Sequence, residues 1–243
     1  MPRYFLAARA VLFYAVYVPL TIFMSVLFML LFPVLPPRSR YLFTSLWAKL
    51  VLQWLRLSCG VHWNVKGVEN LPATPIVILA NHQSSWETLF LYQLFYPVAP
   101  ILKQELLKIP FFGWALRLLH PIAIDRSNPR VAGKSLLTQG TQRIQDGYSV
   151  IVFPEGTRSA PESLGRFSKS GTKMALLAGV PILPVAVRTG HCWPPRRFLK
   201  YSGVVEIEIG EAMQADGRDA NAWTAAIENW MRNRLEKVQG SSD

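Results

Sequence analysis

The hydrophobic pattern divides the chain near residue 60 into an apolar N-terminal segment and a body of alternating short elements. Between Arg9 and Arg38 stand 28 consecutive residues without a formal charge, most of them Leu, Val, Phe and Met. This length exceeds the roughly 20 residues that a helix needs to cross a bilayer. Three prolines at 33, 36 and 37 predict the end of this helix and a turn. A cleaved signal peptide is not favoured, because its apolar core is shorter and a small-x-small cleavage site follows it.

A second N-terminal segment, residues 41–58, has the periodicity of an amphipathic helix, with apolar residues at spacings of three and four. It is either a core helix of the following domain or an interfacial helix with tryptophans at headgroup depth. Arginines flank the first segment on both sides, so the positive-inside rule gives no orientation. We favour a membrane-anchoring hairpin over residues 1–58 whose proline turn dips into the cytoplasmic leaflet. A single full span is the alternative.

From about residue 61, short apolar runs alternate with helical stretches. This alternation is typical of an α/β domain with a largely parallel central sheet flanked by helices. We expect one such domain over residues 59–243, preceded by the membrane-associated two-helix segment. The expected strands are 61–66, 75–80, 98–102, 121–125, 149–153, 181–187 and 203–209, and the expected helices are 84–95, 105–118, 131–146, 169–178 and 219–237.

The chain is basic, with 26 Lys and Arg against 15 Asp and Glu and a formal net charge of +11. This excess favours anionic partners such as a membrane surface or phosphorylated substrates. The basic residues are scattered and form neither a zinc-finger pattern nor an Arg-rich tail, which disfavours nucleic acid. The two cysteines, Cys59 and Cys192, lie far apart, so neither a disulfide framework nor a metal site is expected.

The strongest candidate for chemistry is the sequence Asn81-His82-Gln83-Ser84-Ser85-Trp86-Glu87, directly after an apolar run that reads as a buried strand. A histidine in this place lies at the mouth of an α/β sheet, where ligand sites gather. Glu87, in the first turn of the next helix, is placed to reach back and orient the imidazole. Such a pair forms a general base that can take a proton from an alcohol.

A structural explanation for Glu87 competes with this one. With Ser84 as N-cap, Ser84-x-x-Glu87 is a capping box, in which the carboxylate accepts a hydrogen bond from a backbone N–H. The two roles can coexist, because a carboxylate has two oxygens. Spacing alone proves little, since His120 and Asp125 have the same separation. That second pair spans a predicted strand, which sends the two side chains to opposite faces.

Three further motifs place charged residues after predicted strands. Phe153-Pro154-Glu155-Gly156-Thr157-Arg158 offers backbone N–H groups and a guanidinium that suit a phosphate, although a tight turn with a surface Arg158–Glu155 pair is the plainer interpretation. Lys103 and Arg126 each follow another strand, and each alone reads as an ordinary charged turn. Because parallel strands end on one edge, His82, Lys103, Arg126 and Arg158 together predict a site for a phosphorylated alcohol.

Four blocks occur in order: residues 81–87, 124–126, 153–158 and 180–185. Together they resemble the blocks of the glycerolipid acyltransferase family, and most of all its bacterial lysophosphatidic acid acyltransferase branch. The resemblance covers about residues 60–210. The family usually has Asp where this chain has Glu87. Its second block usually begins with Gly and an aromatic residue, in place of which this chain has His120-Pro121-Ile122-Ala123, so Arg126 alone is carried over from that block.

The resemblance implies acyl transfer from acyl-CoA or acyl carrier protein to the sn-2 hydroxyl of lysophosphatidate, which gives phosphatidate. His82 would be the general base and Glu87 its orienting partner. The phosphate would be bound by Lys103, Arg126, Glu155, Gly156 and Arg158, with Glu155 and Gly156 shaping the loop and with Asn81, Ser84 and Thr157 in support. The fourth block would support its strand. No cofactor beyond the donor is implied, and the expected place is the bacterial inner membrane with the site facing the cytoplasm.

Two other functions and a different acceptor stay open. A lipid esterase or thioesterase would use water in place of the lipid hydroxyl, but the Gly-x-Ser-x-Gly elbow of a serine hydrolase is missing from the sequence. A non-catalytic membrane scaffold would keep the fold without the chemistry. A different lysolipid acceptor would keep the reaction and change only the headgroup.

Overall fold

The computed structural model describes residues 2–125, 127, 129–161 and 163–236. For residues 129 and 130 it describes the backbone only. Its α-helices are α1 (Arg3–Leu31), α2 (Pro37–Cys59), α3 (Trp86–Leu94), α4 (Phe112–Arg117), α5 (Pro129–Gln145), α6 (Ser170–Ala178) and α7 (Ala220–Glu236). Its strands are β1 (Val61–Lys66), β2 (Val77–Ala80), β3 (Val98–Ala99), β4 (Ile101–Lys103), β5 (Ile122–Ile124), β6 (Ser149–Val152), β7 (Ile182–Arg188) and β8 (Gly203–Ile209). Two short 3₁₀ helices, η1 (Val68–Asn70) and η2 (Gln104–Lys108), complete the described elements.

The predicted α/β architecture with a largely parallel sheet is confirmed. Six strands form a sheet in the order β1-β8-β7-β2-β6-β3. All neighbouring pairs are parallel except β7 and β8, which are antiparallel. In the centre, Ile78 of β2 pairs with Leu183 of β7 on one side and Ile151 of β6 on the other. The carboxyl ends of β2, β6 and β7 therefore meet at one edge.

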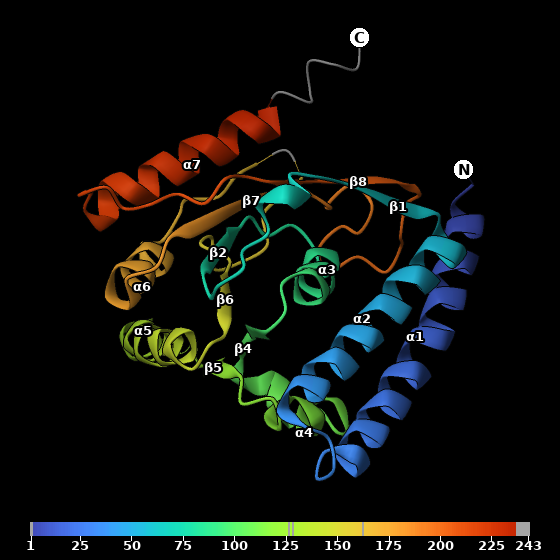
Figure 1. Cartoon of the computed structure of the whole chain (residues 1–243). Coiled ribbons are helices and arrows are strands. Elements are labelled where there is room, and N and C mark those ends of the chain that lie inside the picture. The colour runs from blue at the N-terminus through green and yellow to red at the C-terminus, as the bar shows by residue number, and fades with distance from the viewer. Residues whose placement is uncertain (1, 126, 128, 162, 237–243) are drawn as a thin grey trace.

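Helices cover both faces of this sheet, as the continuous burial of β2 requires. Ile78 and Ala80 pack into a cluster with α2 and α3, whereas Val77 and Leu79 pack into a second cluster with α6 and α7. This alternation follows from the two-residue period of a strand. Figure 1 shows α1 and α2 along one side of the molecule and α5, α6 and α7 along the other.

The N-terminal helices form a hairpin, and the turn between them contains the predicted prolines. Helix α1 is long and apolar enough to cross a membrane, with a mean hydropathy of 2.2 in its best window and 22% of that window buried. Helix α2 starts at Pro37, four residues before the predicted start, because proline is favoured in the first turn. It ends at Cys59 and is capped by Gly60, whose φ of 67° lies in the left-handed region that favours glycine.

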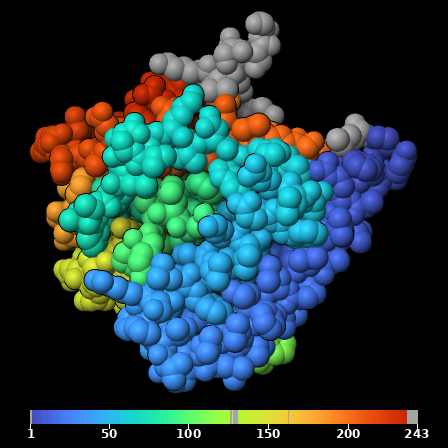
Figure 2. All heavy atoms as spheres, turned by 45° about the vertical axis from the view of Figure 1, so that its right-hand side comes forward, coloured from blue at the N-terminus to red at the C-terminus, as the bar shows by residue number. Residues whose placement is uncertain are grey.

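Helix α2 also belongs to the core of the α/β body. Its Val51, Leu52 and Leu55 are buried in the cluster that includes β2, β7 and α3. Its tryptophans face α1, because the indole N–H of Trp47 donates to Thr21 Oγ1 and that of Trp54 donates to the carbonyl of Phe13, both at 3.2 Å. The side of α2 that carries Val51, Leu52 and Leu55 is therefore that of a core helix, as the first of the two interpretations predicted. Figure 2 shows both helices making up much of one face of the molecule.

Two predicted elements are interrupted by prolines. The expected strand 98–102 is divided at Pro100 into β3, which joins the large sheet, and β4, which pairs with β5 in a separate two-stranded sheet. The expected helix 105–118 is divided into η2 and α4, with Pro110 between them. Proline lacks the N–H that either element needs for continued pairing. The expected strand 121–125 is therefore not part of the main sheet.

Candidate active site

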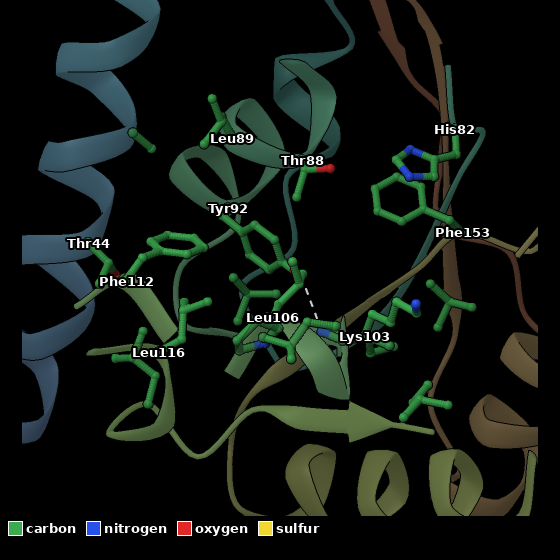
Figure 3. A pocket seen from close by; sticks show the side chains of 18 of the residues that line it. Thr44, His82, Thr88, Leu89, Tyr92, Lys103, Leu106, Phe112, Leu116 and Phe153 are labelled. Atoms are coloured by element: carbon green, nitrogen blue, oxygen red, sulfur yellow. Dashed lines mark hydrogen bonds between the residues drawn. The ribbon is translucent and has the colours of Figure 1, made fainter. Parts of the chain in front are cut away.

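His82 follows β2 after one residue, Asn81, and three neighbours fix its backbone and ring. Asn81 bridges to β7, with its amide donating to the carbonyl of Val187 at 2.9 Å and its oxygen accepting from the Val187 N–H at 2.8 Å. The imidazole stacks on Phe153, with ring centroids 4.2 Å apart, as Figure 3 shows. Its Nδ1 lies 2.8 Å from Glu87 Oε1. Within the described part of the chain, Nε2 has no hydrogen-bond partner.

Glu87 is completely buried and accepts five hydrogen bonds. Oε1 lies 2.8 Å from His82 Nδ1 and accepts from the N–H groups of Gln83 at 2.7 Å and Ser84 at 2.6 Å. Oε2 accepts from Ser84 Oγ and Thr189 Oγ1, both at 2.7 Å. The carboxylate thus serves the backbone, as in a capping box, and orients His82 at the same time. Helix α3 begins at Trp86 with Ser85 as N-cap, one residue after the predicted N-cap Ser84, and Ser84 Oγ still accepts from the Trp86 N–H at 2.8 Å.

These donors decide the charge of Glu87. Burial by itself raises the pKa of a carboxyl group. The hydrogen bond and positive charge of His82, with the bonds from Thr189 and Ser84, outweigh burial and leave the pKa of Glu87 below its ordinary value of 4.5. The ionised form is therefore the stable one near neutral pH. An ionised Glu87 keeps a proton on His82 Nδ1, which leaves Nε2 as the basic nitrogen.

Glu155 positions the second predicted motif against the first. Its Oε1 accepts from the N–H of His82 at 2.7 Å, and its Oε2 accepts from the N–H of Gly165 at 2.9 Å. The N–H of Ser159 donates to the carbonyl of His82 at 2.8 Å. Both carboxylate oxygens thus hold backbone, so Glu155 shapes the loop. The turn needs Gly156, whose φ is 68°.

The predicted cations reach the site from different elements. Arg158 follows β6 and is exposed, and it lines the same cavity as His82, Gly156 and Thr157. Lys103 lines this cavity too, although it ends β4 of the small sheet and its ammonium lies 3.1 Å from Glu105 Oε1. The prediction that Lys103 lies at the same sheet edge as His82 is thus wrong. Lys103 reaches the cavity instead because β4 follows β3 directly after Pro100. Arg126 lies outside the described residues.

The comparison pair His120 and Asp125 does not form a similar unit. Both side chains are exposed, and Asp125 Oδ1 accepts from the N–H of Ser127 at 2.9 Å. No ion pair joins His120 and Asp125 among the residues that the structure describes. Burial and extra donors, rather than the five-residue spacing, distinguish the pair at 82 and 87.

A cavity of about 860 Å³ extends from His82 into the apolar interior. His82 and Lys103 lie towards one end of it in Figure 3, and Arg158 is a further lining residue. Away from them, its walls are mostly apolar and come from α1, α2, α3, α4 and the strands, including Phe28, Trp47, Tyr92, Phe112 and Leu116. Figure 3 shows this change from the His82–Phe153 pair to the side chains nearer α2.

Two residues that join the loops of the site were not predicted as site residues: Gln83, within the first block, and Thr189, outside all four blocks. Gln83 Oε1 accepts from the N–H groups of Thr189 at 3.0 Å and Gly190 at 3.2 Å, and its Nε2 donates to the carbonyl of Pro161 at 3.0 Å. Thr189 follows β7, next to β2 in the sheet. A polar residue directly after a buried strand was the available signal for Thr189, the same signal that selected His82.

Comparisons with known proteins identify the family of this chain. A family profile described as Acyltransferase matches residues 62–188, just over half of the chain. The 1-acyl-sn-glycerol-3-phosphate acyltransferase of Pseudomonas aeruginosa is 44% identical over 236 residues, covering 96% of this chain and 92% of that protein. The protein of the same name from Borreliella burgdorferi is 29% identical over 192 residues, covering 76% of this chain and 75% of that protein.

A solved structure agrees at the level of the fold. The crystal structure of the 1-acyl-sn-glycerophosphate acyltransferase of Thermotoga maritima superimposes with a TM-score of 0.82, at 24% identity and with 100% of both chains covered. The sequence matches carry the family assignment, and this match shows that the whole fold is shared, N-terminal helices included. This chain belongs to the acyltransferase family.

Proposed function

We propose that this protein transfers an acyl chain from a thioester to the sn-2 hydroxyl of 1-acyl-sn-glycerol-3-phosphate and so forms phosphatidate. The names of its relatives support this acceptor. The observation that carries the proposal is the His82–Glu87 pair, bonded at 2.8 Å, at the cationic end of a largely apolar cavity. That end suits a phosphorylated alcohol, and the apolar part suits an acyl chain.

The proposed mechanism is direct attack by the bound alcohol. Nε2 of His82 takes the proton of the lipid hydroxyl as its oxygen attacks the thioester carbonyl. Glu87 stabilises the imidazolium through Nδ1. The tetrahedral intermediate then collapses, the carbon–sulfur bond breaks, and His82 returns the proton to the leaving thiolate. Neither a covalent acyl-enzyme nor a metal or organic cofactor is part of this proposal.

Lys103 and Arg158 are proposed to bind the lysophosphatidate phosphate, with Gly156 and Thr157 lining the same end of the cavity. Arg126 keeps its proposed place in this group, although it lies outside the described residues. An exposed Arg158 offers a planar pair of donors that matches phosphate geometry. Because these groups bind the acceptor in ground and transition state alike, their removal should act mainly on KM.

The hairpin is proposed to anchor the protein in the inner membrane, with the site facing the cytoplasm. Several large apolar residues of α1 point away from the body, among them Val11 at 58%, Phe23 at 62% and Leu30 at 72% exposure. A lysolipid resides in the interface while a thioester head is water-soluble, so a site beside the hairpin would meet both. Coenzyme A and acyl carrier protein are both kept as proposed donors.

The test is an assay of purified protein with several lysolipids, including lysophosphatidate, and with acyl-CoA and acyl carrier protein as donors, read by mass spectrometry. We expect phosphatidate from the wild type and a loss of about 10²–10⁴-fold in kcat for His82→Ala, since a general base contributes that much. A folded His82→Ala protein with a near-normal rate would refute the role of His82. Free fatty acid without a two-chain lipid would select the hydrolase.

A further inference from the structure

The connection between β7 and β8, residues 189–202, is fixed to the active site at its first residues. Thr189 donates to Glu87 Oε2, and the N–H groups of Thr189 and Gly190 donate to Gln83 Oε1. Gly190 also packs closely on the loop that carries Arg158, because a Cβ there would lie 2.8 Å from Pro161 Cγ. The start of this connection is therefore joined both to Glu87, the partner of His82, and to the loop that carries Arg158.

The same connection is fixed to α1 at its other end. Lys200 is 1% exposed, and its ammonium donates to Tyr14 Oη at 3.0 Å and to the carbonyls of Arg197 at 3.0 Å and Phe198 at 2.8 Å. Phe198 stacks on Tyr14 with ring centroids 5.3 Å apart. Two of the three bonds from this buried ammonium hold the backbone at 197 and 198, directly after Arg196, and the third joins it to Tyr14 of α1.

Arg196 lies between these two anchors with a strained backbone. Its φ is 58°, in the left-handed region that non-glycine residues rarely adopt. Such strain persists where the surrounding structure imposes it, and it clusters at binding sites. Arg196 lines the cavity that also holds His82, Lys103 and Arg158, whereas the adjacent Arg197 does not. No ion-pair partner for Arg196 occurs among the described residues.

We propose that Arg196 is a substrate phosphate-binding residue that none of the four motifs contains. The inference rests on the proposed function, because both substrates of that reaction carry phosphate: lysophosphatidate as its headgroup, and the thioester donor on its phosphopantetheine arm. An exposed guanidinium at the cavity, held by a fixed loop, offers paired donors of phosphate geometry. The anchoring of the loop through Thr189 and Lys200 sets the position from which Arg196 reaches the phosphate.

The test compares Arg196→Ala with Arg197→Ala as the matched control, an arginine one position away on the same loop that does not line the cavity. KM for lysophosphatidate and KM for acyl-CoA are each measured at saturating co-substrate. We expect Arg196→Ala to raise one of these KM values about tenfold or more, since charge-assisted hydrogen bonds are worth about 1.5–3 kcal/mol. Arg197→Ala should leave both nearly unchanged. The KM that rises identifies whether the phosphate belongs to acceptor or donor.

A second variant, Arg196→Gly, separates binding from folding. Glycine adopts a φ of 58° without strain, so thermal stability should be kept or rise while KM rises as in Arg196→Ala. Unchanged KM values for both substrates in Arg196→Ala, or equal changes in the Arg197 control, would overturn the proposal. An inactive wild type would instead refute the proposed function, so the two failures are distinguishable.

Discussion

Replacing Thr189 with valine tests whether the fixed carboxylate of Glu87 supports the reaction. Thr189 is buried, and valine has nearly its shape, so the change removes one hydroxyl and little else. Glu87 Oε2 would keep Ser84 Oγ at 2.7 Å as its remaining donor, and Oε1 would keep its three partners. The N–H of Thr189 would still donate to Gln83. The perturbation is therefore confined to one charge-assisted hydrogen bond.

The expected loss of stability is about 1.5–3 kcal/mol, the usual value of a hydrogen bond to a charged group. Its pH dependence has a definite sign. Because the pKa of Glu87 is below its ordinary value of 4.5, its ionised form contributes stability that is fully present above 4.5 and lost as pH falls through the folded pKa. Loss of the Thr189 hydroxyl raises that folded pKa towards 4.5, so the acid loss of stability should be smaller in total and should end at a higher pH. We also expect kcat to fall by about tenfold if the weaker orientation of Glu87 reduces its stabilisation of the His82 imidazolium in the transition state by about 1.4 kcal/mol.

The assay is chemical denaturation in detergent from about pH 3 to pH 8, with kcat measured on the same samples. Thr189→Ser is the control, because it keeps the hydroxyl and should keep both the stability at low pH and most of kcat. If the valine variant matched the wild type in its acid limb and in kcat, the hydrogen bond would not tune Glu87. A stable valine variant with a normal acid limb and a low kcat would point to a direct contact of Thr189 with substrate.

Other predictions follow from single contacts. Arg158→Ala should raise KM for lysophosphatidate with little change in kcat, as measured by steady-state kinetics, and an unchanged KM would count against a phosphate contact. Glu155→Gln should lower stability by about 1.5–3 kcal/mol in denaturant titrations, because a neutral amide replaces the carboxylate that now accepts from the N–H groups of His82 and Gly165. Burial lowers the pKa of Lys200 to about 8, whereas the same group in the unfolded chain keeps its proton up to about 10.5. The free energy of unfolding in denaturant titrations should therefore rise between about pH 8 and 10.5, and Lys200→Met should abolish that rise.

The central strands were predictable because their burial leaves a direct pattern. β2, β6 and β7 are buried on both faces, and in the sequence they are short runs rich in Val, Ile and Leu. The helices of the body follow from periodicity in the same way. Pro100 and Pro110 were visible as well, but their effect depends on tertiary partners, because β4 finds β5 rather than a place in the large sheet.

The candidate site was predictable only where a polar residue follows a buried strand. His82 satisfies that condition, and Glu87 and Arg158 lie within the recognisable motifs that follow β2 and β6. Glu155 places an acidic side chain in the loop that carries Arg158. Its hydrogen bonds with the N–H groups of His82 and Gly165 depend on loop geometry that no local pattern encodes. Gln83 likewise bonds to Pro161, Thr189 and Gly190, which lie 78 to 107 positions further along the chain. Its role is therefore visible only in the folded structure.

These long-range contacts together fix the orientation of the Glu87 carboxylate. Glu has one more rotatable bond than the Asp usual in the resembled family, so it needs more partners to keep one orientation. Those partners come from two strand ends, through the residues around His82 and through Thr189, which follows β7. Gln83 then ties Thr189 to the loop that carries Arg158, and Glu155 ties that loop back to His82. The orientation of the base is thus coupled to the loops that are proposed to hold phosphate, so a variant that loosens one loop should lower kcat even where it leaves His82 untouched.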